Sequence, residues 1–596
     1  MERSPSTLLP HTSAAPGSEG AGSGARCPSW VQIGVVVALA AATAGTAQRQ
    51  PPPWERLRVD VDVLGSAAME GRGTGQPGGR RAAAYIQREL DALLKAPRPA
   101  NLEGQAKTGG ATSRGSYGEP ALHRQAVPIH GATVLDSTRL ELVDHDGTTR
   151  PLRLGEDYVL ADTLPLVLAE PVELVFVGFG ISAPDQDYND YRDVDVAGRV
   201  VVFLEGEPSS DDPAFLDGER PSEHASPERK FLTALGYGAR GAILIPSPLG
   251  GFASDWGRVQ RAFSGEQLTL ASRLVHRFNV WMRLEAAAAL FDGAARDFAT
   301  VLGDVMERQV SSFPLATRLR FESAMRERDF TADNLVVRLP GRDPLLRDQH
   351  VVISAHYDGL GGRPSVPSGA DRHSEPVVYP SVVDNATGTA ALLELVRRFV
   401  DEPPPARSLI FLFATGEEHG RLGSRYFVDH PTVPLRSLVA NINVDGLSII
   451  DTTDEWVGVG AELSTLGELL RESLRTHDLR IGGMPFGLAS REPFTASDQL
   501  SFAEAGVPSI QVMEGLGFRT LRGDVGWRRF VEWGRTRYHT PRDSLNQPIR
   551  WDAVQQHVDV LERFVRHVAD SPQEPSWLPH TPWLEERLRT LAEDGR

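Results

Sequence analysis

The sequence predicts an α/β protein with a mostly parallel sheet covered by helices, into which a second, mixed β/α region is inserted. From residue 331 onward, short runs rich in Val, Ile and Leu alternate with longer stretches of helical periodicity. Residues 129–330 instead contain several β-rich runs and no comparable alternation. The chain has 596 residues, more than one hydrophobic core usually serves, so we expect more than one domain.

The composition is typical of a folded globular protein, with 41% hydrophobic and 24% charged residues. The formal net charge is −17, which argues against a nucleic-acid-binding protein, because such proteins depend on basic patches. We therefore expect no nucleic-acid partner.

The N-terminal region resembles an export signal. Residues 30–44 form an apolar run that is short for a membrane span of about 20 residues, and small residues at 45–47 offer a cleavage site. We predict a signal peptide over residues 1–47, a secreted or periplasmic protein and no stable membrane insertion after cleavage. The alternative is a chain tethered to the membrane by an uncleaved signal anchor. Cys27 is the only cysteine, so cleavage would leave no disulfide and no thiol nucleophile.

The next segment, residues 48–128, is predicted to be the N-terminal part of the main domain. Leu57–Leu64 has a helical pattern, and a second helix begins at Arg81 after a glycine-rich loop over residues 69–80. A glycine-rich loop before a helix can bind phosphate, but no Gly-Lys-Ser/Thr follows here. We therefore interpret this loop as a structural turn.

Residues 129–330 are predicted to form the inserted domain. Strands are expected at residues 140–143, 172–177 and 199–204 because of their β-branched content and the turn residues around them. A helix, a glycine stop and a buried strand follow over residues 231–245.

Residues 331–570 are predicted to form the main domain, and the Pro-rich tail at 571–596 is expected to pack loosely or not at all. Alternating strands and helices imply a sheet with helices on both faces. The predicted strands are residues 335–339, 351–355, 409–414, 438–444 and 507–513, and the predicted helices are residues 387–400, 424–429, 463–476 and 552–569.

Candidate metal ligands follow several of these strands. His356, the pair Glu417-Glu418 and Asp445 each come after a predicted strand, where open α/β sheets place their sites. Asp384 stands at the start of a predicted helix, where it could equally be an ordinary helix cap. With His539 further along the chain, these residue types suit two zinc ions and one general base.

Local context separates the candidates. Asp358, two residues after His356, could fix the tautomer of the imidazole. Glu417 and Glu418 are adjacent, so one can bind metal while the other faces a substrate. On local grounds alone, His539 could be a purely structural histidine.

Five motifs in this order resemble the co-catalytic zinc aminopeptidases, the family that includes bacterial leucyl aminopeptidases and glutamate carboxypeptidases. The segments Tyr188-Asn-Asp-Tyr and Val196-Ala-Gly-Arg-Val-Val-Val of the insert resemble a protease-associated domain. The motifs are His356-Tyr-Asp, Asp384-Asn-Ala-Thr-Gly, Glu417-Glu-His-Gly-Arg-Leu-Gly-Ser, Asn443-Val-Asp and Tyr538-His-Thr-Pro-Arg-Asp.

The resemblance implies a zinc-exopeptidase fold of the phosphorylase/hydrolase-like type and a role for each matching residue. Asp384 would bridge two zinc ions, with His356 and Asp445 completing one site and Glu418 and His539 the other. The two ions would share a water molecule. Two further roles and one backbone feature are implied: Glu417 as general base, Asp358 as the group that orients His356, and a cis peptide bond after Asp384.

The sequence departs from the family at two places. Gln499 stands where the family often has His, from which we expect altered substrate contact. Val383 precedes the bridging residue where another Asp is common. Candidate walls of a substrate pocket lie in residues 486–491 and 518–533, the latter with Trp527, Phe530 and Trp533.

The resemblance therefore predicts a zinc aminopeptidase that acts on peptides with a free N-terminus, and the N-terminal segment alone predicts that it is secreted. A carboxypeptidase or a glutaminyl-cyclase-like enzyme could use the same scaffold, and occupancy of both metal sites would oppose the cyclase. A binding protein without catalysis is a further alternative, against which the intact ligand set argues. Side-chain preference and oligomeric state are not predicted.

Overall fold

The computed structural model describes residues 53–96, 119–208, 210–212, 215–216, 218, 222–247, 256–306, 310–363, 376–483, 492–579 and 581–593. These residues fall within one compact unit. The predicted signal peptide lies outside them. None of the helices in this part of the chain is long and apolar enough to span a bilayer.

The main sheet has nine strands, and the predicted parallel arrangement holds at its centre. Four neighbouring strands, β17, β14, β18 and β21, are parallel, whereas β13 and β19 join them on either side in antiparallel orientation. In order across the sheet, the strands are β10 (Gln267–Leu270), β1 (Ala121–Val134), β13 (Met325–Leu339), β17 (Ser408–Ala414), β14 (His350–His356), β18 (Leu438–Asn443), β21 (Ser509–Glu514), β19 (Glu455–Val459) and β20 (Arg480–Ile481).

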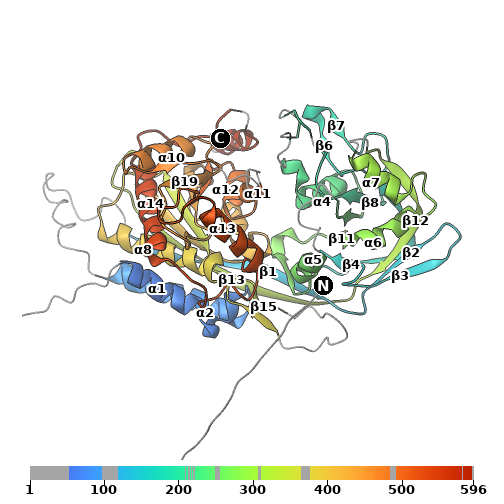
Figure 1. Cartoon of the computed structure of the whole chain (residues 1–596), viewed down its shortest axis with the longest axis horizontal. Coiled ribbons are helices and arrows are strands. Elements are labelled where there is room, and N and C mark those ends of the chain that lie inside the picture. The colour runs from blue at the N-terminus through green and yellow to red at the C-terminus, as the bar shows by residue number, and fades with distance from the viewer. Residues whose placement is uncertain are drawn as a thin grey trace, which may run out of the picture. The chain divides into compact units, whose positions relative to one another are not determined.

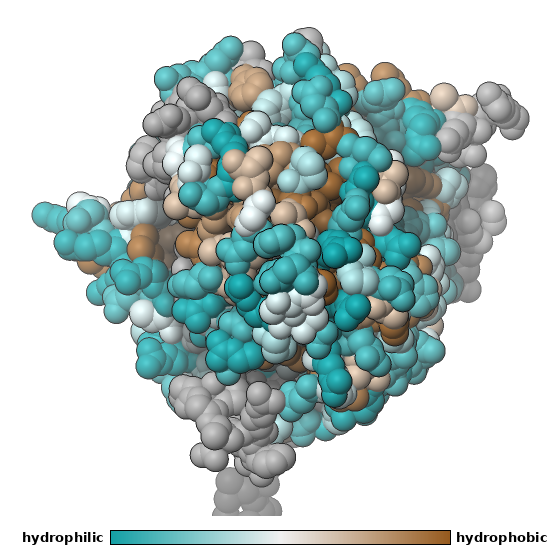
Figure 2. Space-filling view, turned by 90° about the vertical axis from the view of Figure 1, so that its right-hand side faces the viewer, coloured by the Kyte–Doolittle hydropathy of each residue, from teal (hydrophilic) through white to brown (hydrophobic). Residues whose placement is uncertain are grey.

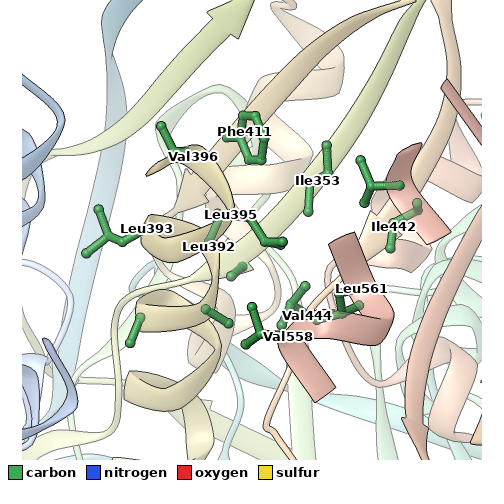
Figure 3. Packing of buried hydrophobic residues seen from close by; sticks show 14 of the residues in the cluster. Ile353, Leu392, Leu393, Leu395, Val396, Phe411, Ile442, Val444, Val558 and Leu561 are labelled. Atoms are coloured by element: carbon green, nitrogen blue, oxygen red, sulfur yellow. The ribbon is translucent and has the colours of Figure 1, made fainter. Parts of the chain in front are cut away.

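Helices cover both faces of this sheet, which explains why its central strands are buried along their whole length and mostly apolar. Figure 3 shows Ile353 and Phe411 of the strands packed among Leu392, Val396 and other side chains of the largest hydrophobic cluster. Helices α1 (Pro53–Leu64), α2 (Pro77–Lys95), α8 (Gly388–Asp401), α10 (Leu466–Arg475) and α14 (Trp551–Asp570) pack on that face, and α9 (Leu422–Asp429) and α12 (Gln499–Glu504) on the other.

Residues 139–322 form a second sheet of eight strands, which has a hydrophobic cluster on each face. Helices α4 (Pro227–Gly236) and α5 (Trp256–Phe263) contribute to one cluster, and α6 (Leu284–Ala287) and α7 (Phe298–Met306) lie at the other (Figure 1). Its strands, in order, are β3 (Thr149–Leu152), β2 (Arg139–Val143), β12 (Phe313–Glu322), β5 (Val167–Phe176), β8 (Val200–Leu204), β9 (Gly241–Ile245), β11 (Phe278–Met282) and β4 (Tyr158–Leu160).

Two long strands link this region to the main sheet. In chain order, β1 leads into the region of the second sheet and β13 leads back out of it. The two strands pair in antiparallel register from Ala121↔Arg338 to Val134↔Met325. The division into a main and an inserted domain remains a prediction, as does the likeness to a protease-associated domain.

On the face shown in Figure 2, hydrophilic side chains predominate and apolar ones lie in small groups between them, as is typical of a water-facing surface.

The C-terminal tail packs beside the main sheet, so the expectation of loose packing is wrong. Trp577 and Trp583 are buried with Phe494 in a separate hydrophobic cluster. In helix α15 (Leu584–Glu593), the buried Arg587 donates a hydrogen bond to the carbonyl of Leu438 at 3.0 Å. The prolines favour an extended tail, but the two tryptophans of this segment supply enough apolar surface to fix it.

Candidate active site

The five predicted metal ligands meet at the carboxyl edge of the central parallel strands. His356 ends β14, Glu418 lies in a short 3-10 turn after β17, and Asp445 follows β18. Asp384 lies just before α8, and His539 follows α13 (Val525–Thr536). Parallel strands end at the same edge of a sheet, and this brings residues that are far apart in the sequence together.

The ligands form two groups that share Asp384. In each group, one ligand atom per residue lies within 4.8 Å of the others. Nε2 of His356 is 3.2 Å from Oδ1 of Asp445 and 3.3 Å from Oδ1 of Asp384. Nε2 of His539 is 3.0 Å from Oδ2 of Asp384 and 3.3 Å from Oε2 of Glu418. Asp384 therefore offers one oxygen to each group.

The donor set fits metal ions. Within the described part of the chain, the carboxylates of Asp384, Glu418 and Asp445 form ion pairs with these two histidines and with no Lys or Arg. Oε1 of Glu418 is buried and has no hydrogen-bond partner. Buried carboxylates without a cationic partner are costly, and imidazole with carboxylate oxygens is a typical zinc donor set. Each group could hold one such ion.

The surrounding carboxylates raise the pKa values of both histidines, His356 and His539. Burial lowers the pKa of His539, but Glu418 and Asp384 outweigh it and raise the pKa to about 9. Burial also opposes the shift at His356, whose pKa Asp445, Asp358 and Asp384 nevertheless raise well above its usual value. Cations are therefore favoured at both positions.

Glu417 belongs to neither ligand group and faces the same cavity. Its Oε2 lies 3.9 Å from Nε2 of His356. Burial, together with the charges of Asp445, Asp498 and Glu418, raises the pKa of Glu417 well above its usual value, although His356 acts in the opposite direction. A carboxyl group beside metal ligands with a raised pKa is suited to accept and release a proton.

Asp358 is fully buried between the two strand ends. Its Oδ1 lies 3.7 Å from Nδ1 of His356. Its carboxylate also accepts hydrogen bonds from the backbone N–H of Glu417 at 3.2 Å, from that of Glu418 at 3.4 Å and from the Thr74 hydroxyl at 3.1 Å. Asp358 therefore positions the glutamate turn as well as the histidine, which the sequence did not reveal.

The peptide bond between Asp384 and Asn385 is cis, as the family resemblance implied. The side chain of Asp543 holds this turn. Its carboxylate accepts hydrogen bonds from the N–H groups of Val383 at 3.0 Å and Asp384 at 3.2 Å, and from Nε2 of Gln547 at 2.6 Å. The only sequence signal for Asp543 was its place in the motif that contains His539.

The glycine-rich loop is a structural turn, as predicted. Arg72, at its start, is fully buried and donates hydrogen bonds to four backbone carbonyls, among them Tyr357 at 2.9 Å and Pro380 at 2.9 Å. A Cβ on Gly71 would meet the carbonyl oxygen of Tyr379, and its φ of +69° also favours glycine. The loop thus fastens the segments that carry His356 and Asp384.

Four of the five predicted ligands, all except His356, line a cavity of about 440 Å³. Of the predicted pocket walls, Phe530 and Trp533 line this cavity, Trp527 is not among the lining residues, and residues 486–491 lie outside the described part of the chain. The other apolar side chains that line it are Val383, Leu447, Ile449, Ile450, Val459, Ala496 and Met513.

Gln499 does not contact the cavity, so the expectation of an altered substrate contact is wrong. The side chain is fully buried, accepts a hydrogen bond from Nδ2 of Asn443 at 2.7 Å and donates one to the carbonyl of Phe494 at 2.9 Å. It therefore supports the strand end that precedes Asp445.

Comparison with known proteins finds similarity to peptidases. Residues 334–565 match the family model of peptidase family M28. Aminopeptidase YwaD of Bacillus subtilis is 28% identical over 228 residues, which cover 38% of this chain and 42% of YwaD. A vacuolar membrane protease of Clavispora lusitaniae is 33% identical over 259 residues, 41% of this chain and 20% of that protein. The chain thus spans less than half the length of these curated relatives.

Among solved structures, an aminopeptidase from Aneurinibacillus sp. strain AM-1 aligns with 89% of this chain and 96% of its own, with a TM-score of 0.48 and 16% identity. A zinc aminopeptidase from Bacillus subtilis aligns with 88% of this chain and 97% of its own, with a TM-score of 0.42 and 18% identity.

The comparisons contradict the predicted secreted or periplasmic location. Several relatives, including those from Vanderwaltozyma polyspora and Saccharomyces cerevisiae, are named vacuolar membrane proteases, and none of these names denotes an exported enzyme. The prediction depended on the apolar run at residues 30–44, which lies outside the described residues.

Proposed function

Because residues 334–565 belong to peptidase family M28, we propose that this chain is a zinc-dependent aminopeptidase that removes N-terminal residues from peptides. The observation that carries the proposal is the pair of ligand groups joined by Asp384, with Glu417 beside them in one cavity. The name of the relative YwaD, an aminopeptidase, supports the same reaction.

Two zinc ions are proposed, one per ligand group. His356, Asp384 and Asp445 would hold the first, and Asp384, Glu418 and His539 the second. Bound zinc supplies Lewis acidity, which polarises a peptide carbonyl and lowers the pKa of water. The unpaired, buried Oε1 of Glu418 supports a metal ion at the second group.

The protein's own contribution to catalysis is proposed to come from Glu417. It would take the proton from the attacking water molecule and deliver it to the leaving amine. Asp358 would keep Glu417 in place through the backbone of the glutamate turn, and would hold the His356 ring in the orientation that metal binding needs.

The substrate is proposed to be a peptide with a free N-terminus. A first residue with a long apolar portion would fit the cavity, because Ile449, Met513, Phe530 and Trp533 line it.

Metal content per chain, measured together with hydrolysis of leucine p-nitroanilide and its N-acetyl derivative, tests this proposal. We expect two zinc ions and cleavage of the free-amine substrate alone. Two zinc ions without cleavage of either compound would retain the ligand assignment and reject the aminopeptidase. One zinc ion or none would reject the two-ion site.

A further inference from the structure

The active-site cavity contains an acid that belongs to neither ligand group. Glu514 is the last residue of β21 and lines the cavity together with the ligands. Its side chain is half-buried, and the surroundings desolvate it enough to raise its pKa. A group that is surrounded by protein and still accessible directs its free surface into the cavity.

No cation of the described chain compensates Glu514. The polar side chain that acts on its carboxyl group is the Ser448 hydroxyl, and no Arg, Lys or His contributes to its pKa. A desolvated carboxylate without a positive partner is unfavourable, and a ligand that brings its own cation would remove that cost.

Glu514 lies well away from the metal ligands. Gln511, in the same strand, donates a hydrogen bond from Nε2 to the carbonyl of Asp445 at 2.9 Å. Glu514 is three residues further along, and an extended strand advances by roughly 10 Å over that distance. Consistent with this separation, the acids at the ligand groups influence the pKa of Glu417 and Glu418 but not that of Glu514.

The cavity that Glu514 lines also has apolar walls. Leu447, Ile449, Met513 and Trp533 line it in addition to the acid. Lysine and arginine carry a positive group at the end of an apolar stem, and they commonly lay this stem along apolar surface.

We propose that Glu514 makes the enzyme prefer peptides whose first residue is arginine or lysine. The apolar walls contact the stem of the side chain, and Glu514 forms a charge-assisted hydrogen bond with its end. This inference rests on the proposed aminopeptidase function. The free α-amine is not the group that Glu514 binds, because it is one atom removed from the scissile carbonyl and must lie beside the metal ligands.

Arginine and citrulline p-nitroanilides test the proposal, because the two side chains differ little in shape and citrulline is uncharged. In the wild type, we expect kcat/KM for arginine to exceed that for citrulline by at least about tenfold, the scale of one hydrogen bond to a charged group. In Glu514→Gln, this ratio should fall close to one. Glu455→Gln is a matched control, because Glu455 lies on the adjacent strand β19 and pairs with Arg480.

An unchanged ratio in Glu514→Gln would overturn the proposal. An equal loss for both substrates would also overturn it, since Glu514 would then act on the α-amine. If the wild type hydrolysed no anilide, the aminopeptidase proposal would fail by itself. Binding of L-arginine and L-citrulline to the same three proteins, measured by calorimetry, would then decide the role of Glu514: tighter binding of arginine that Glu514→Gln abolishes supports it, and equal affinities reject it.

Discussion

Asp384 shows how much of the site depends on single side chains. Its two carboxylate oxygens face different histidines, and Asp543 fixes the turn from behind by binding two successive N–H groups. The sequence predicts all five candidate ligands because each lies in a recognisable motif, and the structure brings their side chains together. It could not identify the support from Arg72 or Asp543, since most of those hydrogen bonds join residues that are between 159 and 309 positions apart in the sequence.

Replacing Glu417 by glutamine is expected to separate metal binding from catalysis. Glu417 belongs to neither ligand group, so zinc content should stay at the wild-type value. Activity on leucine p-nitroanilide should fall by at least about a hundredfold, because the amide cannot accept the proton. Metal analysis and steady-state kinetics on one preparation check both expectations.

Asp384→Ala is the matched comparison, because it removes an oxygen from both ligand groups. Its zinc content should fall below that of Glu417→Gln. Undiminished activity in Glu417→Gln would reject the general base, and two bound ions in Asp384→Ala would reject the bridging ligand.

At the level of helices and strands, the central part of the sheet was predictable and its margins were not. β14, β17 and β18 are buried along their whole length, so their apolar runs stand out in the sequence. β1 has a mixed burial pattern and lies beside residues that read as a loop, and its partner β13 comes some 200 residues later. Only the pairing with two strands distant in the sequence, β13 and β10, makes β1 a strand.

Helix α14 is fixed to the edge of the active site by a buried histidine. His557 accepts a hydrogen bond at Nδ1 from the N–H of Ser448 at 3.1 Å, and its Nε2 lies 3.0 Å from the carbonyl of Val512. Burial lowers the pKa of His557 to about 4. The folded state therefore requires the neutral ring.

This histidine is expected to make the protein sensitive to acid. His557 takes up a proton near pH 6.5 in the unfolded state but only near pH 4 in the folded state. The contribution of the neutral ring to the free energy of unfolding is therefore fully present above pH 6.5 and is lost as the pH falls towards 4. His557→Gln should weaken the dependence of Tm on pH between 6.5 and 4, by an amount equivalent to at most about 3 kcal/mol. His567→Gln, at a more exposed position of the same helix, is the control. An unaltered pH dependence in His557→Gln would show that other groups dominate.

In the whole molecule, the active site combines segments that lie far apart in the sequence. Arg72 in the N-terminal part binds the backbone next to His356 and Asp384, and His539 arrives from beyond the last strand of the sheet. Ions bound between these segments would tie them together, so metal binding and global stability should be linked.

Removal of the metal is therefore expected to lower Tm. An ion at a hundred times its Kd stabilises a protein by about 2.7 kcal/mol, so chelation should lower Tm by several degrees. Differential scanning calorimetry before chelation, after chelation and after return of zinc measures the effect. Glu417→Gln should show the same shift, because it keeps the ligands. An unchanged Tm after chelation would contradict the link between metal binding and stability.

The pairing of β1 with β13 also has a consequence for the order in which the chain can fold. During synthesis, residues 121–134 leave the ribosome well before Met325–Leu339, the strand beside which they lie. Helix α1 is likewise synthesised well before α8, the helix on which it packs. Glu394 of α8 accepts hydrogen bonds from Arg56 of α1 at 2.7 and 3.2 Å. The eight-stranded sheet has all its strands within residues 139–322 and can be completed first. The N-terminal segments must therefore stay unpaired until the main sheet emerges, so the catalytic half of the molecule is the last to take shape.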